Sequence, residues 1–323
     1  MLRVAWFDNV TADVEAAVRM LPECESCPHE TYLEILQASV GFATRIAVVA
    51  DDSGPAAVIA LVRRSRLVWE PLGNWLFPGP EFPARDGMYV EALKALRLET
   101  PVAWWRMAEA PPRGDRIDHL SIEPVYRQDD LAQREAYWRN TNYFRHIRAA
   151  RNRTSKLEVR VGIPEFAEQI AAGWRTKWTA SPAGDPEVRN RGILARALEP
   201  LGRHVTIGLF DNGRLAAGCT NFVHRGALVA GVLYVPEAYR ALSAGVRLID
   251  LAFEEGARRG LSGFDLGGGA DYKLKWAPPV GERARFTVAG AAHVRLLRGL
   301  AGMAKRVLRR GNAADSAPAI ADG

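Results

Sequence analysis

Apolar residues in the first half of the chain follow two periods, one typical of helices and one typical of strands. Helical spacing of apolar positions predicts helices at residues 10–20, 32–40 and 88–98. Short runs rich in β-branched and apolar residues predict strands at residues 44–49, 56–62, 66–72, 102–107 and 118–122. The Asp-Asp-Ser-Gly-Pro sequence at 51–55 is typical of a tight turn, so the first two strands are expected to form a hairpin.

The second half begins with a long stretch that contains neither proline nor glycine. Residues 129–153 are therefore predicted to form one long helix that joins the two halves. A strand at 157–161 and helices at 164–178 and 185–201 follow.

A three-stranded antiparallel meander is the most readable part of the chain. Its predicted strands lie at 205–210, 215–223 and 227–235. The first two are joined by Asn212-Gly213, which is typical of a two-residue hairpin turn, and the last two by Arg225-Gly226. A loop, an amphipathic helix at 243–259, a strand at 263–266 and a last strand at 286–288 follow. Both halves thus repeat one rough plan. The predicted fold class is α/β (α+β), with two lobes, at 1–142 and 143–290, each a mixed, mostly antiparallel sheet flanked by helices.

Composition supports two ordinary domains and argues against a membrane-spanning chain. The 323 residues are 48% hydrophobic and 25% charged, and no apolar run is long enough to cross a bilayer. The first residues lack the pattern of a signal peptide, which predicts a cytoplasmic protein. Cys24 and Cys27 form a Cys-x-x-Cys motif, but no second ligand pair exists, so no metal site is expected.

The formal net charge of +6 is concentrated in two predicted helical stretches, at 139–160 and 293–310. Basic helices bind nucleic acid, anionic membranes or phosphorylated substrates, although more often they are solvated faces. We expect no nucleic-acid partner. The basic helix at 291–310 is a candidate for weak contact with a membrane surface, although packing against the second lobe is favoured. The tail at 311–323 is expected to be disordered.

The loop that enters the helix at 243–259 has the features of a phosphate-binding site. The first N–H groups of a helix lack intrahelical partners, and the helix dipole adds partial positive charge there. Ser243 is expected to cap the helix, and Gly245 lets the backbone approach a ligand closely. The candidate pyrophosphate cradle comprises Arg240, Leu242, Ser243, Ala244, Gly245, Val246 and Arg247. Taken alone, the segment favours a plain capped helix after a loop, because single glycines before helices are common.

Four segments in order make the chain resemble a known family. They are Trp174-Arg175-Thr176-Lys177-Trp178, Gly213 to Gly218, Glu237 to Gly245, and Phe264 to Trp276, which reads Phe-Asp-Leu-Gly-Gly-Gly-Ala-Asp-Tyr-Lys-Leu-Lys-Trp. Together they resemble the GNAT-superfamily acetyltransferases of the BioF2-like/CelD-like group, relatives of the FemAB transferases. The resemblance covers residues 143–290. Ala244 stands where the group usually has proline, and Pro236 where it often has an acidic residue.

The resemblance implies two GNAT-like lobes and an acyl-CoA co-substrate, acetyl-CoA or a longer acyl-CoA. The pantetheine arm would lie between the separated ends of the strands at 227–235 and 263–266, and an amine or hydroxyl of the acceptor would attack the thioester. Asp271 and Asp265 are candidate bases, and Tyr272 and Tyr234 are candidate proton donors. Lys273 would hold an anionic group of the acceptor, and Lys177 and Trp178 would line the acceptor groove. In the alternative interpretation, Asp265 caps the glycine turn, and Tyr234 and Trp178 pack in the core.

Three functions remain open at this point. The first is an acyltransferase that moves an acyl group from acyl-CoA to a small molecule, a sugar or a glycan or peptidoglycan precursor of the cell envelope. The second is a FemAB-type aminoacyltransferase with aminoacyl-tRNA as donor. The third is a GNAT-like pair of lobes that binds a partner without catalysis.

Overall fold

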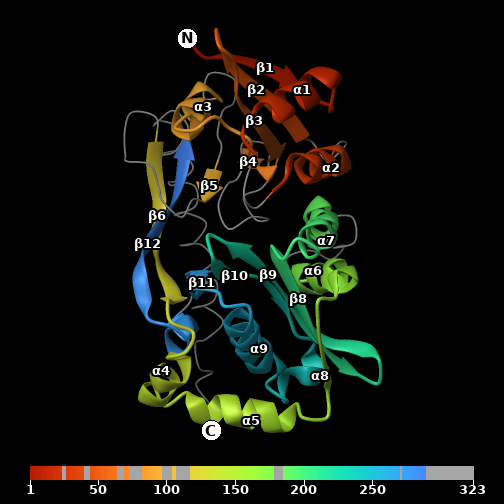
Figure 1. Ribbon diagram of the computed structural model, residues 1–323, viewed down its shortest axis with the longest axis vertical. Coiled ribbons are helices and arrows are strands. Elements are labelled where there is room, and N and C mark those ends of the chain that lie inside the picture. Colours follow the sequence, from red (N-terminus) through yellow and green to blue (C-terminus); the bar gives the residue numbers. More distant parts are fainter. Residues whose placement is uncertain are drawn as a thin grey trace, which may run out of the picture.

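A computed structural model of the chain describes most of the two predicted lobes. The described residues are 1–23, 27–39, 44–63, 69–72, 82–96, 104–106, 117–177, 185–269 and 271–288. The basic helix expected at 291–310, the tail at 311–323, Cys24 and Trp178 lie outside them. Two sheets, each with helices packed against it, make up this part of the molecule (Figure 1).

The first sheet is a four-stranded antiparallel sheet in the order β1-β2-β3-β4. Its strands are β1 (Arg3–Phe7), β2 (Thr44–Asp51), β3 (Gly54–Arg63) and β4 (Trp69–Pro71), and its helices are α1 (Ala12–Met20), α2 (His29–Ser39) and α3 (Tyr89–Leu96). The predicted hairpin is confirmed as the β2–β3 pair. Strand β1 was not predicted, because five residues are too few to establish a period of two.

The second sheet has eight strands in the order β5-β12-β6-β11-β10-β9-β8-β7. They are β5 (Trp104–Arg106), β6 (Ile117–Gln128), β7 (Glu158–Val161), β8 (His204–Asp211), β9 (Arg214–His224), β10 (Ala227–Tyr234), β11 (Phe264–Gly268) and β12 (Pro279–Val288). Among the described strands, β10 and β11 are the one parallel pair. The predicted fold class, a mixed and mostly antiparallel sheet flanked by helices, is confirmed.

Strand β6 belongs to the first predicted lobe by sequence and to the second sheet by its strand pairing. It precedes the boundary predicted at residue 142, yet it pairs with β11 on one side and with β12 on the other. In Figure 1, β6 and β12 form a long ribbon that runs from the second sheet toward α3. The second sheet is therefore built from both halves of the chain, which the order of elements alone did not indicate.

The helix predicted at 129–153 is wrong as a single element. The structure has α4 (Arg134–Asn140) and α5 (Phe144–Arg153) instead. Asn142 separates them with a left-handed backbone, at φ 56°, which an α-helix cannot continue. Asparagine is one of the few residues that adopt this conformation at low cost.

The remaining helices cover both faces of the second sheet. They are η2 (Pro164–Phe166), α6 (Ala167–Arg175), α7 (Pro186–Leu198), α8 (Glu237–Arg240), α9 (Ala244–Arg258) and the 3₁₀ helix η4 (Asp271–Lys275). On one face, a Cβ added at Gly218 of β9 would lie 2.5 Å from Ile170 of α6. On the other face, the Cys219 thiol lies 4.0 Å from the Leu248 carbonyl oxygen of α9. Side chains of successive strand residues thus alternate between α6 and α9.

Helix α7 joins the two lobes through a shared core. Ile193 and Leu194 belong to the same buried cluster as the apolar residues of β2, β3 and α2. In that contact the Asn190 side-chain amide donates a buried hydrogen bond of 3.0 Å to the Ser39 hydroxyl of α2. The second lobe consequently rests on the first through packed apolar side chains.

Candidate active site

The central feature of the second sheet is a gap between its two parallel strands. Strands β10 and β11 pair at Leu228↔Phe264 and Val229↔Asp265, and beyond these two pairs no ladder joins them in the described structure. Strand β11 turns away, with an irregular register toward β6 and a left-handed backbone at Gly267, at φ 71°. Among the described residues, the edge of β10 that follows Val229 therefore has no strand partner, as the family resemblance implied.

A bulge in β10 shapes the edge that borders the gap. The register between β10 and β9 shifts between Ala230 and Leu233, and the amide of Val232 donates instead to the Thr220 hydroxyl at 3.3 Å. A Cβ added at Gly231 would lie 2.6 Å from the Thr220 carbonyl oxygen. Glycine is therefore required at this position, because any side chain would push β10 away from β9.

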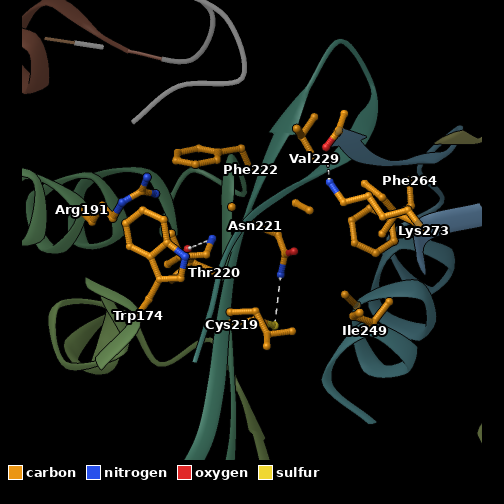
Figure 2. Close-up of a pocket in the computed structure, with 18 of the residues that line it drawn as sticks. Trp174, Arg191, Cys219, Thr220, Asn221, Phe222, Val229, Ile249, Phe264 and Lys273 are labelled. Carbon is orange, nitrogen blue, oxygen red and sulfur yellow. Dashed lines mark hydrogen bonds between the residues drawn. The ribbon is translucent and has the colours of Figure 1, made fainter. Parts of the chain in front are cut away.

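A cavity of about 280 Å³ lies at the gap. Its lining residues come from α6, α7, β9, β10, α9, β11, η4 and β12: Trp174, Arg191, Cys219, Thr220, Asn221, Phe222, Val229, Ala230, Gly231, Val232, Leu233, Ile249, Ala252, Phe264, Leu266, Gly267, Gly268, Tyr272, Lys273 and Arg283. Figure 2 shows Trp174 and Arg191 on one side, Lys273 and Phe264 on the other, and Asn221 between them.

Residues from both faces of the sheet line the cavity. The alternation along β9 directs Cys219 and Asn221 toward α9, and the Asn221 amide donates to the Cys219 sulfur at 3.6 Å. Thr220 and Phe222 are directed toward α6 and α7. The cavity therefore has one half beside α9 and another beside α6 and α7, and the two meet where β10 and β11 separate.

The predicted phosphate cradle at the start of α9 is present as a helix terminus, but Ser243 does not cap it. Ser243 has a left-handed backbone, at φ 58°, and makes no side-chain capping bond. Its hydroxyl instead accepts a hydrogen bond of 3.1 Å from the Arg153 guanidinium of α5. At Gly245, an added Cβ would meet Val235 at 3.4 Å, an ordinary contact, so packing alone does not demand a glycine there.

The two arginines of the predicted cradle are engaged with carboxylates. Arg247 pairs with Asp250 and with Glu254, the latter at 3.1 Å, which directs its guanidinium along the helix toward later turns. The Asp250 side chain is fully buried and also accepts two hydrogen bonds from Arg151, at 2.8 and 2.7 Å. Arg240 is exposed and pairs with Glu237. A role for Arg240 and Arg247 in phosphate binding stays a prediction.

Two predicted catalytic residues lie outside the described lining of the cavity. The Asp265 carboxylate accepts a hydrogen bond of 2.6 Å from the Gly267 amide, so it caps the glycine turn. Asp271 begins η4 and is exposed.

The two candidate proton donors differ in position. The ring of Tyr234 packs on Gly173 of α6, where an added Cβ would lie 2.5 Å from the ring, and it does not line the described cavity. Tyr272 does line it. Desolvation raises the pKa of the Tyr272 phenol above its usual value, so the group stays protonated at neutral pH.

The two lysines predicted to bind the acceptor also differ in position. Lys273 lines the cavity, and its ammonium group donates a hydrogen bond of 2.8 Å to the Gly268 carbonyl oxygen (Figure 2). Lys177 is exposed, just after the end of α6, and is not among the described lining residues.

Helix α4 holds η4, and hence Tyr272 and Lys273, against the sheet. The Tyr137 hydroxyl donates a hydrogen bond of 2.6 Å to the Leu274 carbonyl oxygen. Trp138 and Trp276, both almost fully buried, pack edge to face. The residues that position η4 therefore lie before the segments that carried the family resemblance.

Several of the residues that line the cavity were not predicted from the sequence. Trp174 belongs to the Trp-Arg-Thr-Lys-Trp segment, but Lys177 and Trp178 were chosen from it instead. Arg191, Asn221 and Arg283 gave no local signal, because only the strand pairing and the docking of α7 bring them to the cavity.

Nucleophilic thiol and metal chemistry find no support among the described residues. Burial raises the pKa of the Cys219 thiol to about 12, so it remains protonated at neutral pH. Within the described part of the chain, no group of three or more His, Cys, Asp and Glu residues could hold a metal ion.

Comparison with known families identifies the class of protein. Residues 141–275 match the family described as an acetyltransferase (GNAT) domain. This part of the chain is therefore a GNAT domain, and it is of the acyltransferase class of enzyme. The matched residues contain every helix and strand from α5 to η4, and with them every described lining residue of the cavity except Arg283.

A solved structure with a TM-score above 0.5 shows the same fold over most of the chain. The C-terminal domain (DUF2156) of a protein from Agrobacterium fabrum, described as a lysylphosphatidylglycerol synthetase, is 14% identical, with a TM-score of 0.51, over 83% of this chain and 93% of that one. A tandem GNAT protein from the clavulanic acid biosynthesis pathway is 12% identical (TM-score 0.45; 89% and 98% covered). FemX is 11% identical (TM-score 0.46; 87% and 96% covered). No curated protein matches the sequence.

The described helices contain no candidate for a membrane span, since none is both long and apolar enough.

Proposed function

We propose that the protein transfers an acyl group from acyl-CoA to an amine or hydroxyl of a small molecule, a sugar or a cell-envelope precursor, in the cytoplasm. The observation that carries this proposal is the gap between β10 and β11, which opens into a cavity next to the start of α9. An extended chain with amide groups can add to an unpaired strand edge, and a helix N-terminus attracts phosphate.

The donor would bind from the side of α9. The amides of the pantetheine arm would pair with the β10 edge after Val229, and the pyrophosphate would lie over the first turn of α9, at residues 242–247. The α9 half of the cavity has the matching character, because Ile249, Ala252 and Leu233 give it an apolar wall. The acceptor would then enter from the side of α6 and α7, beside Trp174, and extend across the cavity toward Lys273 on the opposite side.

The reaction itself needs little from the protein beyond positioning. The acceptor nitrogen or oxygen attacks the thioester carbonyl carbon, the new amide or ester bond forms, and the carbon–sulfur bond breaks. Tyr272 would return a proton to the departing thiolate, since its raised pKa keeps the phenol protonated. Asp271 and Asp265 stay candidate acceptors of the proton that the nucleophile loses, and Tyr234 a second candidate donor.

Thermal unfolding with and without acetyl-CoA tests the donor. A ligand that binds only the folded state at about 100 times its Kd stabilises it by about 2.7 kcal/mol, so we expect a clear rise in Tm. Aminoacyl-tRNA should give no rise, and a rise with aminoacyl-tRNA alone would favour the FemAB-type alternative.

A matched pair of variants at Gly245 locates the donor site. Gly245→Glu places a carboxylate at the start of α9 and should abolish the rise with acetyl-CoA. Gly245→Ala should retain the rise, because its Cβ has room. If both variants respond as the parent protein does, the cradle is not where the donor binds.

A further inference from the structure

We propose that the acceptor carries an anionic group, a carboxylate or a phosphate, and that Lys273 and Arg283 bind it at the end of β11. This inference rests on the proposed acyl transfer, and it specifies the chemical class of the acceptor.

The two cations approach one point of the cavity wall. A Cβ placed on Gly267 would lie 3.3 Å from the Arg283 Nη2 atom and 3.7 Å from the Lys273 Nζ atom. Both residues line the cavity. The absence of a side chain at Gly267 thus allows two positive groups from separate elements, β12 and η4, to meet beside the gap.

Each cation is held in place by a neighbour. The Arg283 Nε atom donates a hydrogen bond of 3.1 Å to Glu123, and the side chains of this pair are only 20% and 19% exposed. The Lys273 Nζ atom donates to the Gly268 carbonyl oxygen at 2.8 Å. A preorganised ammonium and guanidinium can share one carboxylate or phosphate through charge-assisted hydrogen bonds.

All charged residues in the described lining of the cavity are positive. Arg191, Lys273 and Arg283 line the cavity, whereas no aspartate or glutamate is among its described lining residues. The Glu187 carboxylate pairs with Arg191 at 3.0 Å and the Glu123 carboxylate pairs with Arg283, and neither glutamate is among the described lining residues. A ligand in the cavity would therefore meet positive charge first.

Positive charge also suits the transfer step. An ammonium group near other cations has a lowered pKa, because like charges disfavour its protonated form. The amine of the acceptor would therefore be deprotonated more readily in this cavity. The attraction between the anionic group of the acceptor and Lys273 and Arg283 would offset the repulsion between its ammonium group and the same cations.

Equilibrium binding of product-like probes tests the proposal without a donor. We would measure the Kd of N-acetylglycine against N-acetylglycinamide, and of N-acetylglucosamine 6-phosphate against N-acetylglucosamine, at constant ionic strength. Within at least one pair, the anionic member should bind about tenfold or more tightly, the effect of a charge-assisted hydrogen bond. The pair that responds distinguishes a carboxylate from a phosphate.

Variants assign the preference to the two cations. Lys273→Met and Arg283→Met should each reduce the preference to about threefold or less, while leaving the Kd of the neutral member unchanged. Lys275→Met is the matched control, because Lys275 lies on the same 3₁₀ helix and does not line the described cavity. It should keep the preference of the parent protein.

Three results would overturn the proposal: equal binding of both members of both pairs, no binding of any probe, or a preference that survives in both methionine variants. Failure of the donor assignment is recognised separately, since it removes the response to acetyl-CoA and leaves these measurements unchanged.

Discussion

The indole Nε1 of Trp138 donates a hydrogen bond of 3.0 Å to the backbone carbonyl oxygen of Trp276. The two rings also pack edge to face, with centroids 5.6 Å apart, and Phe253 of α9 contacts both. Trp138 precedes the matched GNAT domain and Trp276 follows it. This pair therefore fastens η4, which carries Tyr272 and Lys273, to the helix that leads into the domain.

Replacing Trp138 with phenylalanine should destabilise the protein by about 1–3 kcal/mol. The substitution leaves the buried Trp276 carbonyl without its donor and removes part of an aromatic contact. Urea unfolding followed by fluorescence measures the change. Tyr137→Phe is the control, because its hydroxyl bond to Leu274 is exposed and should be worth less than about 1 kcal/mol. Equal losses in the two variants would contradict a special role for the tryptophan pair.

Gly231→Ala should close the binding gap. The added Cβ would come within 2.6 Å of the Thr220 carbonyl oxygen, so β10 must shift, at a cost of about 1–3 kcal/mol. We expect a lower Tm and a weaker response to acetyl-CoA. Gly281→Ala, in β12, is the matched control, because nothing lies within 4 Å of its Cβ position. A full response to acetyl-CoA in Gly231→Ala would show that the bulge does not shape the donor site.

Tyr272→Phe should lower turnover by about 10²-fold while the rise in Tm with acetyl-CoA is retained, since proton transfer to the thiolate is lost and donor binding is not. Desolvation raises the pKa of Tyr272, so the fall in turnover of the parent protein that comes from tyrosine ionisation should have its midpoint above that of an ordinary tyrosine, about pH 10. Tyr89→Phe, in the first lobe, should leave turnover unchanged. Unaltered turnover in Tyr272→Phe would remove this residue from the mechanism.

His204 should make stability depend on pH below neutrality. Burial lowers its pKa in the folded protein, against the opposing effect of Glu199. Well above about pH 6.5, the usual pKa of histidine, the side chain is neutral in both the folded and the unfolded state. Below that pH, the unfolded chain binds the proton more readily than the folded one, so stability falls as pH falls, by up to about 1.4 kcal/mol per pH unit.

The comparison of His204→Gln with the parent protein isolates this effect. Urea unfolding between about pH 7.5 and pH 5.5 should show a smaller loss of stability in the variant, because glutamine does not titrate. Parallel pH dependences would mean that other groups account for the loss.

Local turn chemistry accounts for the parts of the fold that the sequence predicted well. Asn212 and Gly213 have φ of 48° and 78°, the conformation that an Asn-Gly hairpin turn demands, and the meander around them formed as expected. The break at Asn142 depends on the same kind of residue. It was missed because an isolated asparagine within helical spacing is a weak signal beside an explicit Asn-Gly pair.

The candidate site was predictable only in part. Family resemblance indicated the gap between β10 and β11 and placed Tyr272 and Lys273 near it. Arg191 and Arg283 reach the cavity through the docking of α7 and the pairing of β12 with β6, which depend on contacts between residues far apart in sequence. A pattern read along one segment carries no information about such partners.

The position of β6 has a consequence for how the chain is made. Glu123 of β6 lies opposite Arg283 of β12, and 160 residues separate them. During synthesis, β1 to β4 can pair as soon as they leave the ribosome. The backbone N–H and C=O groups on both edges of β6 stay unpaired until its partners, β11 and β12, have been synthesised. Unpaired strand edges can pair with the wrong strand or with another chain. The nascent chain should therefore depend on chaperones, although every strand of the folded second sheet is paired.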